Sequence, residues 1–401
     1  MADAEGSISF FSALSTFSGK LVSKLFIMNP GKNLIFSPLS IHSCLGMIRL
    51  GADEGTTTAK ELDKGIGFTS SDESEIAEDF HIALEPYQDD TMLNMAYKMY
   101  VMQEFEIRPE FHEILTEKFH SEPENVDFSE NTVAAEKINE WIETKMNHLI
   151  KDQVSPDILN ETTGLVLISA AHFKAEWSIG FSARATRREF FHIDPKNKIR
   201  VLMMNNFHEY DYADLKQFDA KALRLNFSNT PLQMIIILPN KTFGLETLIE
   251  ALSTTSLENI ISLLTRKRVY LKLPKFTAEF EQDLTPVFPE FGVKRIFMNK
   301  AELGKISETN RVIKVSSVLH KASIELSEAG DEVLPLPELK PTMVKGKIRK
   351  PPSPVNFYAD HPFYYAIYDA VHGPLVVGSL QAPLPAPCIN NPLKPCYCER
   401  S

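Results

Sequence analysis

The clearest clue to the fold lies in residues 311–369, which read "RVIKVSSVLHKASIELSEAGDEVLPLPELKPTMVKGKIRKPPSPVNFYADHPFYYAIYD". The middle of this segment, 335–354, holds six prolines and five Lys or Arg residues. Because proline has no backbone N–H to donate to a neighbouring strand, this part is not expected to lie inside a sheet. Strand-like patterns flank it at 311–326 and 363–369. The sequence therefore predicts two strands joined by a long exposed loop.

The rest of the chain predicts helices first and strands later. In residues 132–151 one face of a helix is apolar, through Ala134, Ile138, Trp141, Ile142 and Leu149. The later segments 164–173 and 232–238 are short apolar runs rich in β-branched residues, and 268–276 alternates as a strand does. No repeat or Gly/Ser-rich linker divides the chain. We therefore predict one α+β domain.

Composition restricts the class of protein. The chain has 401 residues, of which 43% are hydrophobic and 24% charged, as in an ordinary globular protein. Its net charge of −11 argues against a nucleic-acid binder. No apolar run reaches about eighteen residues, so neither a membrane-spanning helix nor membrane insertion is expected.

The N-terminal segment bears on localisation. It starts acidic and then becomes amphipathic, with an apolar helical stripe of Phe10, Leu14, Phe17, Leu21 and Leu25. A secretory signal needs a basic start followed by a continuous apolar block, and neither is present. We expect a cytoplasmic protein, one exported without a cleaved signal peptide, or a mature form.

The four cysteines do not predict a metal site. Cys44 lies in an apolar run and is expected to be a buried thiol. The other three, Cys388, Cys396 and Cys398, lie in residues 382–401, a Pro-rich tail with no nearby His. We therefore expect no bound metal and a tail that is either disulfide-bonded or free.

The sequence lacks the usual catalytic motifs. G-x-S-x-G, H-E-x-x-H and the phosphate-binding glycine patterns are all absent. Asp360 and His361 are adjacent, but a structural role is expected for both, and His112 and His120 resemble helix-surface residues. We therefore expect neither an enzyme nor a cofactor. The exposed loop becomes the main candidate for function, since loops on rigid scaffolds often carry it.

Several motifs in chain order resemble the serpin family of serine protease inhibitors, in particular its leaderless, intracellular-type members. They are "NLIFSPLSI" (33–41), "LGADEGTTTAKEL" (50–62), "VLISAAHFKAEW" (166–177), "HKASIELSEAG" (320–330) and "FYADHPF" (357–363). The resemblance spans nearly the whole chain. It implies a single serpin domain with three β-sheets, about nine helices and an exposed reactive-centre loop. Its expected bounds are 1–381 for the domain, 328–356 for the loop and 382–401 for the tail.

The resemblance also implies a mechanism. In serpins a target serine protease attacks the loop and forms an acyl-enzyme, and the cut loop then inserts into the central sheet. The protease is carried along and trapped, so the inhibitor is a suicide substrate. The expected partner is therefore a serine protease held in a covalent complex with a monomer. The segment where some relatives carry a heparin-binding helix is acidic, so heparin activation is not expected.

The resemblance places the cleaved bond by counting. Sixteen residues beyond Glu328, the expected hinge glutamate, the count reaches Val344–Lys345. A bond after Val344 suits an elastase-like or chymotrypsin-like protease. The loop also looks several residues longer than usual, which leaves other residues open as the cleavage position. These alternatives are Met343 and, for a trypsin-like protease, Lys345, Lys347 and Arg349.

The expected hinge departs from the family pattern. Its residues are Glu328, Gly330, Asp331, Pro335 and Pro337. Asp331 replaces a small polar residue that is buried on insertion, and burying an unpaired carboxylate costs several kcal/mol. The two prolines each remove a ladder hydrogen bond, at about 1 kcal/mol apiece. We expect slower insertion, and the alternative is a non-inhibitory serpin that acts as a binding or carrier protein or as a plain protease substrate.

Five further residues are implied by the resemblance. Ser37, Ser40, Ser169 and His320 correspond to a polar cluster beneath the opening sheet. Ser169 stands where the family usually has Asn, so an altered hydrogen-bond network is expected. Trp177 corresponds to the tryptophan at the top of the sheet, where insertion begins.

Overall fold

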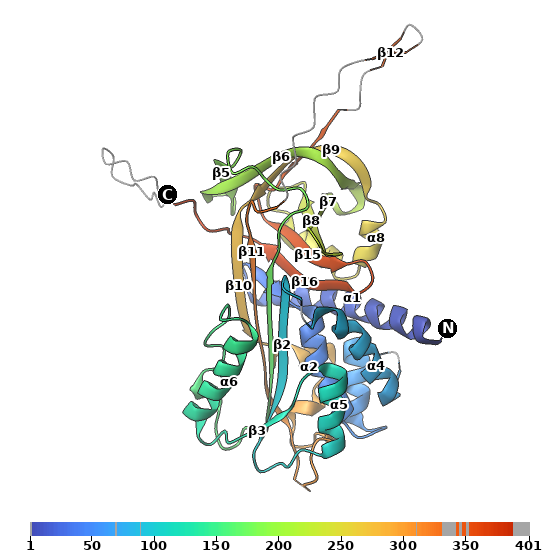
Figure 1. Ribbon diagram of the computed structural model, residues 1–401, viewed down its shortest axis with the longest axis vertical. Coiled ribbons are helices and arrows are strands. Elements are labelled where there is room, and N and C mark those ends of the chain that lie inside the picture. The colour runs from blue at the N-terminus through green and yellow to red at the C-terminus, as the bar shows by residue number, and fades with distance from the viewer. Residues whose placement is uncertain are drawn as a thin grey trace, which may run out of the picture.

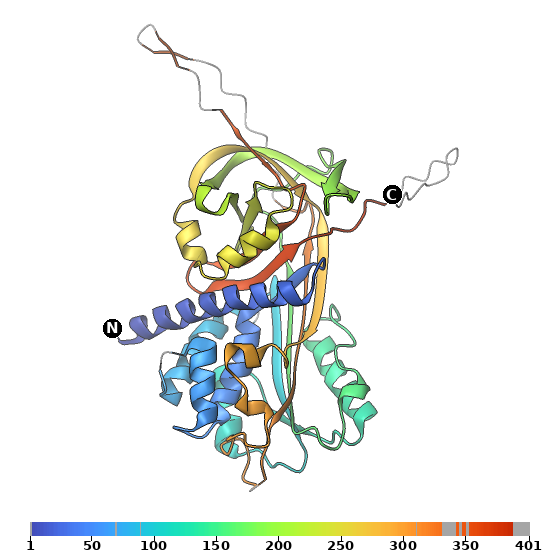
Figure 2. The ribbon, with the colours of Figure 1, turned by 180° about the vertical axis from the view of Figure 1, so that it is seen from behind.

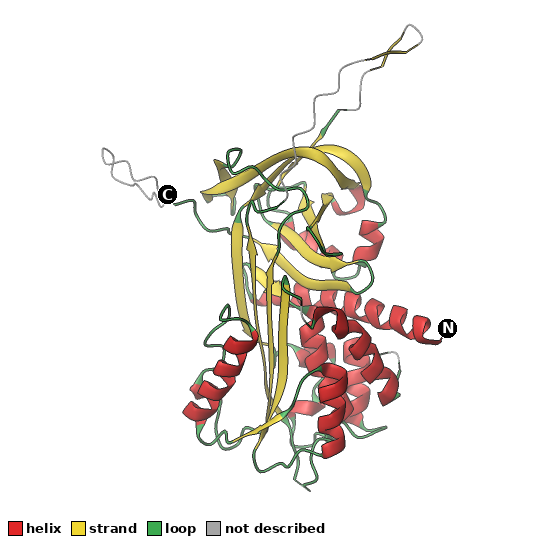
Figure 3. Ribbon diagram, in the orientation of Figure 1, coloured by secondary structure: helices red, strands yellow, loops and turns green. Residues whose placement is uncertain are grey.

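The computed structural model describes residues 2–68, 70–88, 90–309, 311–330, 342–344, 347–349 and 353–387. Within these residues the chain has the predicted α+β composition, with eight α-helices. Figure 3 shows most helices in the lower half of the view and many of the strands in the upper half. The helices are α1 (Ala2–Met28), α2 (Pro38–Gly51), α3 (Thr57–Leu62), α4 (Glu73–Leu84), α5 (Pro109–Phe119), α6 (Asn131–Lys145), α7 (Leu245–Leu252) and α8 (Leu257–Ile261).

Local sequence signals explain the ends of the helices near the candidate sites. Ser37 precedes α2, and its side chain accepts a hydrogen bond from the Ser40 N–H, while Pro38 takes the first helical position. Pro109 likewise opens α5. His120 ends α5 in the left-handed region with φ 51°, which stops the helix and redirects the chain.

The predicted N-terminal helix is confirmed, and its apolar stripe is buried. Figure 2 shows α1 crossing the back of the molecule. Although α1 has 27 residues, no helix in the described chain is long and apolar enough to cross a membrane.

The helix predicted at 132–151 is shorter than expected. It ends at Lys145, because Asn147 and His148 turn the chain with φ of 49° and 62°. Leu149 was wrongly placed on the buried stripe, since it is 50% exposed.

The five-stranded sheet runs along the length of the molecule (Figure 1). One side of its lower half faces α6, and the other faces α2, α4 and α5. The central strands β11 and β4 pair directly with each other in the parallel direction, so no described strand lies between them. In spatial order the strands are β10 (Phe276–Asp283), β11 (Val315–Leu326), β4 (Leu165–Lys174), β2 (Leu93–Met102) and β3 (Glu124–Val126).

The second large sheet has nine strands. A third large sheet is not separate in the described residues, because the 18-residue β6 pairs with β5 and β9 along one part and with β7 along the other. It thereby joins two groups of strands into one sheet. The nine are β1 (Leu34–Phe36), β5 (Arg187–His192), β6 (Lys198–Leu215), β7 (Ala220–Asn226), β8 (Gln233–Pro239), β9 (Thr265–Pro274), β14 (Val355–Tyr358), β15 (Phe363–Asp369) and β16 (Gly373–Leu380).

Candidate functional site

The expected loop leaves the five-stranded sheet at Leu326, the end of β11, and rejoins the fold at Val355, the start of β14. Between them, β12 (Thr342–Val344) and β13 (Lys347–Arg349) pair antiparallel. Figure 1 shows this two-stranded ladder far above the two large sheets. Four of the five candidate cleavage residues belong to the ladder: Met343, Val344, Lys347 and Arg349. Lys345 lies outside the described residues, as do Asp331, Pro335 and Pro337.

The start of the loop is held by backbone contacts to the segment that follows β4. The Trp177 N–H donates to the Ala329 carbonyl at 2.9 Å, and the Phe181 N–H donates to the Glu328 carbonyl at 3.1 Å. The indole Nε1 of Trp177 donates to the Ser327 carbonyl at 2.8 Å. Trp177 is itself buried and stacks on Phe227. The expected hinge therefore begins directly above β4 and β11.

The side chain of Glu328 is fixed by two partners. Its Oε2 lies 2.8 Å from the Lys275 Nζ, and its Oε1 accepts a hydrogen bond from the Thr186 hydroxyl at 3.0 Å. Partial burial opposes ionisation, but the hydrogen bonds from Lys275 and Thr186 outweigh it and hold the pKa of Glu328 below its usual value. The hinge glutamate is thus an ionised anchor. Neither partner was identified from the sequence, since both are distant along the chain.

Gly330 occupies a place where a side chain does not fit. It forms a parallel bridge with Trp177. A Cβ atom at this position would overlap the Trp177 carbonyl oxygen and lie 2.9 Å from the Gly180 Cα. These are backbone atoms or atoms close to the backbone, so the contact cannot be relieved by rotating a flexible side chain.

We expect Gly330→Ala to release this end of the loop and to lower the free energy of unfolding by about 1–3 kcal/mol, as overpacking does. Urea unfolding followed by tryptophan fluorescence measures the loss, because Trp177 reports on the contact. Ala329→Ser is the matched control, since Ala329 is exposed and a hydroxyl there meets no such overlap. Equal stability of the two variants would show that the close contact of Gly330 with Trp177 does not require the absence of a side chain.

Side chains link β4 to β11 along their shared edge, which we call the β4–β11 seam. In the register of these two strands, Ser169 lies opposite His320, His172 opposite Ser323, and Lys174 opposite Glu325. The three side-chain distances are 2.8, 2.8 and 2.9 Å respectively. A strand entering the seam would separate all three pairs. The last two pairs were not predicted, because the register between strands about 150 residues apart is not visible in the sequence.

The structure brings Ser37, Ser40, Ser169 and His320 together beneath the seam, and all four are buried. The Ser37 N–H donates to His320 Nε2 at 3.2 Å, so Nδ1 carries the proton of the neutral ring. Nδ1 then donates to Ser169 Oγ at 2.8 Å, and Ser169 Oγ donates to Ser40 Oγ at 2.8 Å. This series of hydrogen bonds ends where Ser40 Oγ donates to the Ser37 carbonyl at 3.4 Å. Ser169 therefore supplies both an acceptor and a donor.

Burial determines the protonation state of His320. The ring is fully buried, and desolvation lowers its pKa from 6.5 to about 3. The neutral form is also required by the hydrogen bonds, because a protonated Nε2 could not accept from the Ser37 N–H. At neutral pH the cluster is thus uncharged.

Gln153 was missed by sequence reasoning. Its Nε2 donates to the Ser169 carbonyl at 3.1 Å and to the Leu319 carbonyl at 3.2 Å, one on each strand of the seam. The residue follows α6 and is buried. Beside it lies a cavity of about 540 Å³, lined by α6, the segment after it, and parts of β10 and β11. Gln153 therefore bridges the seam from the α6 side of the sheet.

The adjacent Asp360 and His361 do contact each other, with 2.8 Å between Oδ1 and Nδ1. His361 Nε2 donates to the Pro239 carbonyl at 2.8 Å, and the ring is buried. Both ring nitrogens are therefore occupied by the fold, which is consistent with the structural role expected for the pair.

Comparisons with known proteins agree with this geometry. A family model described as Serpin (serine protease inhibitor) matches residues 12–383. An antitrypsin of Bombyx mori is 32% identical over 354 residues, covering 88% of each chain. Serine protease inhibitor 42Dd of Drosophila melanogaster is 31% identical, covering 84% of this chain and 88% of its own. The solved structure of cleaved Serpin 42Da is 39% identical, with a TM-score of 0.83 over 94% of this chain and 99% of that one.

Proposed function

Because the chain belongs to the serpin family, we propose that it inhibits a serine protease as a suicide substrate. The protease would cleave the loop between β12 and β13 and form an acyl-enzyme. The freed N-terminal part of the loop would then enter the β4–β11 seam as a new strand and carry the protease with it. The chain itself is the inhibitor and not a catalyst.

The single observation that carries this proposal is the position of residues 327–330. They are bonded to Trp177 and Phe181 above a seam in which no described strand lies between β4 and β11. Continuing the chain downward from Gly330 would lead it between these two strands. The seam is held by its backbone ladder, by three side-chain pairs and by Gln153, so a strand that enters it breaks these contacts and replaces one backbone ladder with two.

We propose Val344–Lys345 as the cleaved bond and an elastase-like or chymotrypsin-like protease as the target. Val344 ends β12, in the ladder that Figure 1 shows far above the two large sheets. Lys347 and Arg349 belong to β13 and would direct a trypsin-like protease to the same ladder. The specificity of the target therefore depends on which bond of the ladder is cut.

A second function, as a carrier protein or a plain protease substrate, is favoured by one specific feature. Asp331, Pro335 and Pro337 stand in the part of the loop that would enter the seam. A buried carboxylate and two missing N–H donors oppose insertion. If the cut loop inserts before the protease is released, the chain acts as an inhibitor. If the protease is released first, the chain acts as a plain substrate.

The test is to mix the chain separately with elastase, chymotrypsin and trypsin and to analyse the products on denaturing gels. We expect a covalent band near the summed mass and a released peptide that begins at Lys345. A Val344→Arg variant is the matched control and should shift trapping from elastase to trypsin. A peptide beginning after Lys347 or Arg349 would instead support a basic cleavage position. Cleavage by all three proteases without any covalent band would contradict inhibition.

A further inference from the structure

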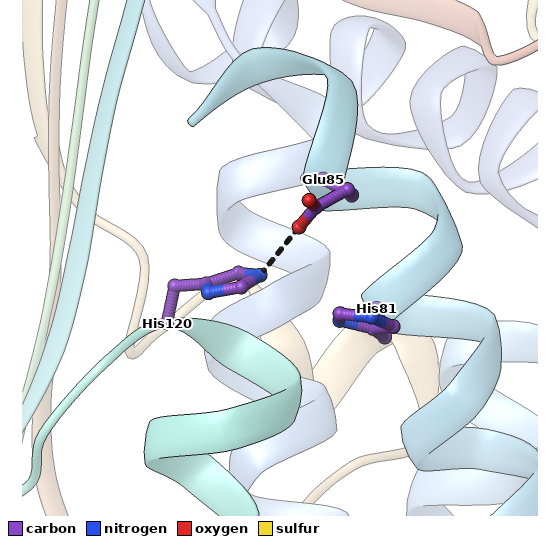
Figure 4. A group of neighbouring side chains, drawn as sticks. All are labelled: His81, Glu85 and His120. Carbon is purple, nitrogen blue, oxygen red and sulfur yellow. Dashed lines mark ion pairs between the residues drawn. The ribbon is translucent and has the colours of Figure 1, made fainter. Parts of the chain in front are cut away.

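Two histidines and a glutamate from different helices meet on the surface of the α4–α5 pair (Figure 4). His81 and Glu85 are four residues apart at the end of α4, so they share one face. His120 comes from the end of α5, and its Nε2 lies 3.1 Å from Glu85 Oε2. One ligand atom from each of the three residues lies within 4.8 Å of the others.

The positions of these side chains follow from the packing of the two helices. A salt bridge of 2.6 Å between Lys118 and Glu78 joins α5 to α4 nearby. The left-handed backbone of His120, with φ 51°, ends α5 and lets its imidazole approach α4. The rings of His81 and His120 lie 5.5 Å apart between centroids. His120 was expected from the sequence only to lie on a helix surface, because its neighbours come from a separate helix.

We propose that His81, Glu85 and His120 bind a divalent transition-metal ion of the Zn²⁺ type. Two imidazoles and one carboxylate form a ligand set that suits Zn²⁺ in a site with three protein ligands and one open position. Imidazole ligands also favour Zn²⁺ over Ca²⁺ or Mg²⁺, which prefer oxygen ligands. The helical spacing of four residues between His81 and Glu85 allows both to reach one ion.

The geometry requires only small side-chain movements. Ligand atoms about 2.0–2.2 Å from a tetrahedral ion are about 3.3 Å from one another. The pair formed by His120 and Glu85 already meets this spacing at 3.1 Å. The remaining separations are at most 4.8 Å. Glu85 and His120 are exposed, so both side chains can rotate toward His81 without repacking the core.

A second observation also points to a ligand. In the part of the chain that the structure describes, the buried Nδ1 of His81 has no hydrogen-bond partner. Buried polar atoms of side chains normally have hydrogen-bond partners, and leaving one unpaired costs free energy, even though the His81 side chain as a whole is only partly buried. Side-chain groups of the described chain therefore do not fully satisfy His81, and an ion bound by its ring would supply an interaction that it lacks. The site is remote from the hinge residues, so this proposal does not rest on protease inhibition.

Equilibrium dialysis and calorimetry with Zn²⁺ on the full chain test the proposal. The background is a variant with Cys388→Ser, Cys396→Ser and Cys398→Ser, so that the thiols of the tail do not compete for the ion. We expect one ion per chain and a melting temperature that rises with Zn²⁺ concentration. With Co²⁺ as a second probe, we expect the intense visible absorption of a four-coordinate ion.

Ligand variants decide whether the ion occupies this site. His120→Gly retains a residue suited to the left-handed backbone and removes the imidazole, and Glu85→Gln removes the carboxylate. Each should weaken Zn²⁺ binding by about tenfold or more. His112→Asn is the matched control, because His112 is an exposed histidine of α5 outside the cluster. Equal Zn²⁺ affinity in all of these variants, or no binding by the background protein, would overturn the proposal.

Discussion

Limited proteolysis of the loop is expected to raise the melting temperature of the protein by on the order of 10 °C. A strand that enters the seam beside the ten residues of β4 replaces one ladder with two. The net gain is about ten backbone hydrogen bonds, at roughly 1 kcal/mol each. The entropy of unfolding for a 401-residue chain is roughly 0.8 kcal/mol/K, which converts this gain into the stated shift. Differential scanning calorimetry before and after cleavage measures it.

The hinge substitutions provide the comparison for this experiment. Asp331→Thr combined with Pro335→Ala and Pro337→Ala removes the buried carboxylate and restores two ladder donors. We expect this variant to insert faster and to yield more covalent complex with the same protease. A cleaved wild-type chain whose melting temperature does not change would contradict insertion, and a rise restored only in the variant would identify the hinge sequence as the cause.

The elements of the fold could be predicted from the sequence because their patterns are local. The apolar runs at 164–173 and 232–238 became β4 and β8, and the alternation at 268–276 lies mostly in β9. The end of α6 could not be predicted, because it depends on two positive φ angles that Asn147 and His148 adopt without a glycine signal.

The contacts of the candidate sites were predictable only in part. The family resemblance brought Ser169 and His320 into one cluster, but their direct hydrogen bond depends on the register of two strands separated by about 150 residues. Gln153 lies in an irregular segment with no motif, so only its distances to both strands reveal its role. His81 and His120 meet because two helices pack side by side, which periodicity within one helix does not specify.

Mild acid is expected to destabilise the folded protein through His320. Its folded pKa is about 3, while the unfolded value is near 6.5. Below pH 6.5 the unfolded chain therefore binds a proton that the folded chain does not, so the free energy of unfolding falls as pH falls. Between pH 7.5 and 5 the loss is about 2 kcal/mol for one such histidine. His42, also fully buried with a pKa lowered to about 3 by desolvation, adds a similar loss.

Replacing His320 with Asn isolates its share of this pH dependence. At pH 7.5 the variant is expected to be less stable than the wild type, because the Ser37 N–H loses its acceptor. The free energy of unfolding that is lost between pH 7.5 and 5, however, should be about 2 kcal/mol smaller in the variant than in the wild type, since one buried titrating group is gone. Urea unfolding at several pH values measures the slope, and His112→Asn, which replaces an exposed histidine instead of a buried one, is the control. If His320→Asn kept the full wild-type slope, His320 would take up a proton in the folded state as it does in the unfolded chain, and its protonated Nε2 could not accept the hydrogen bond from the Ser37 N–H.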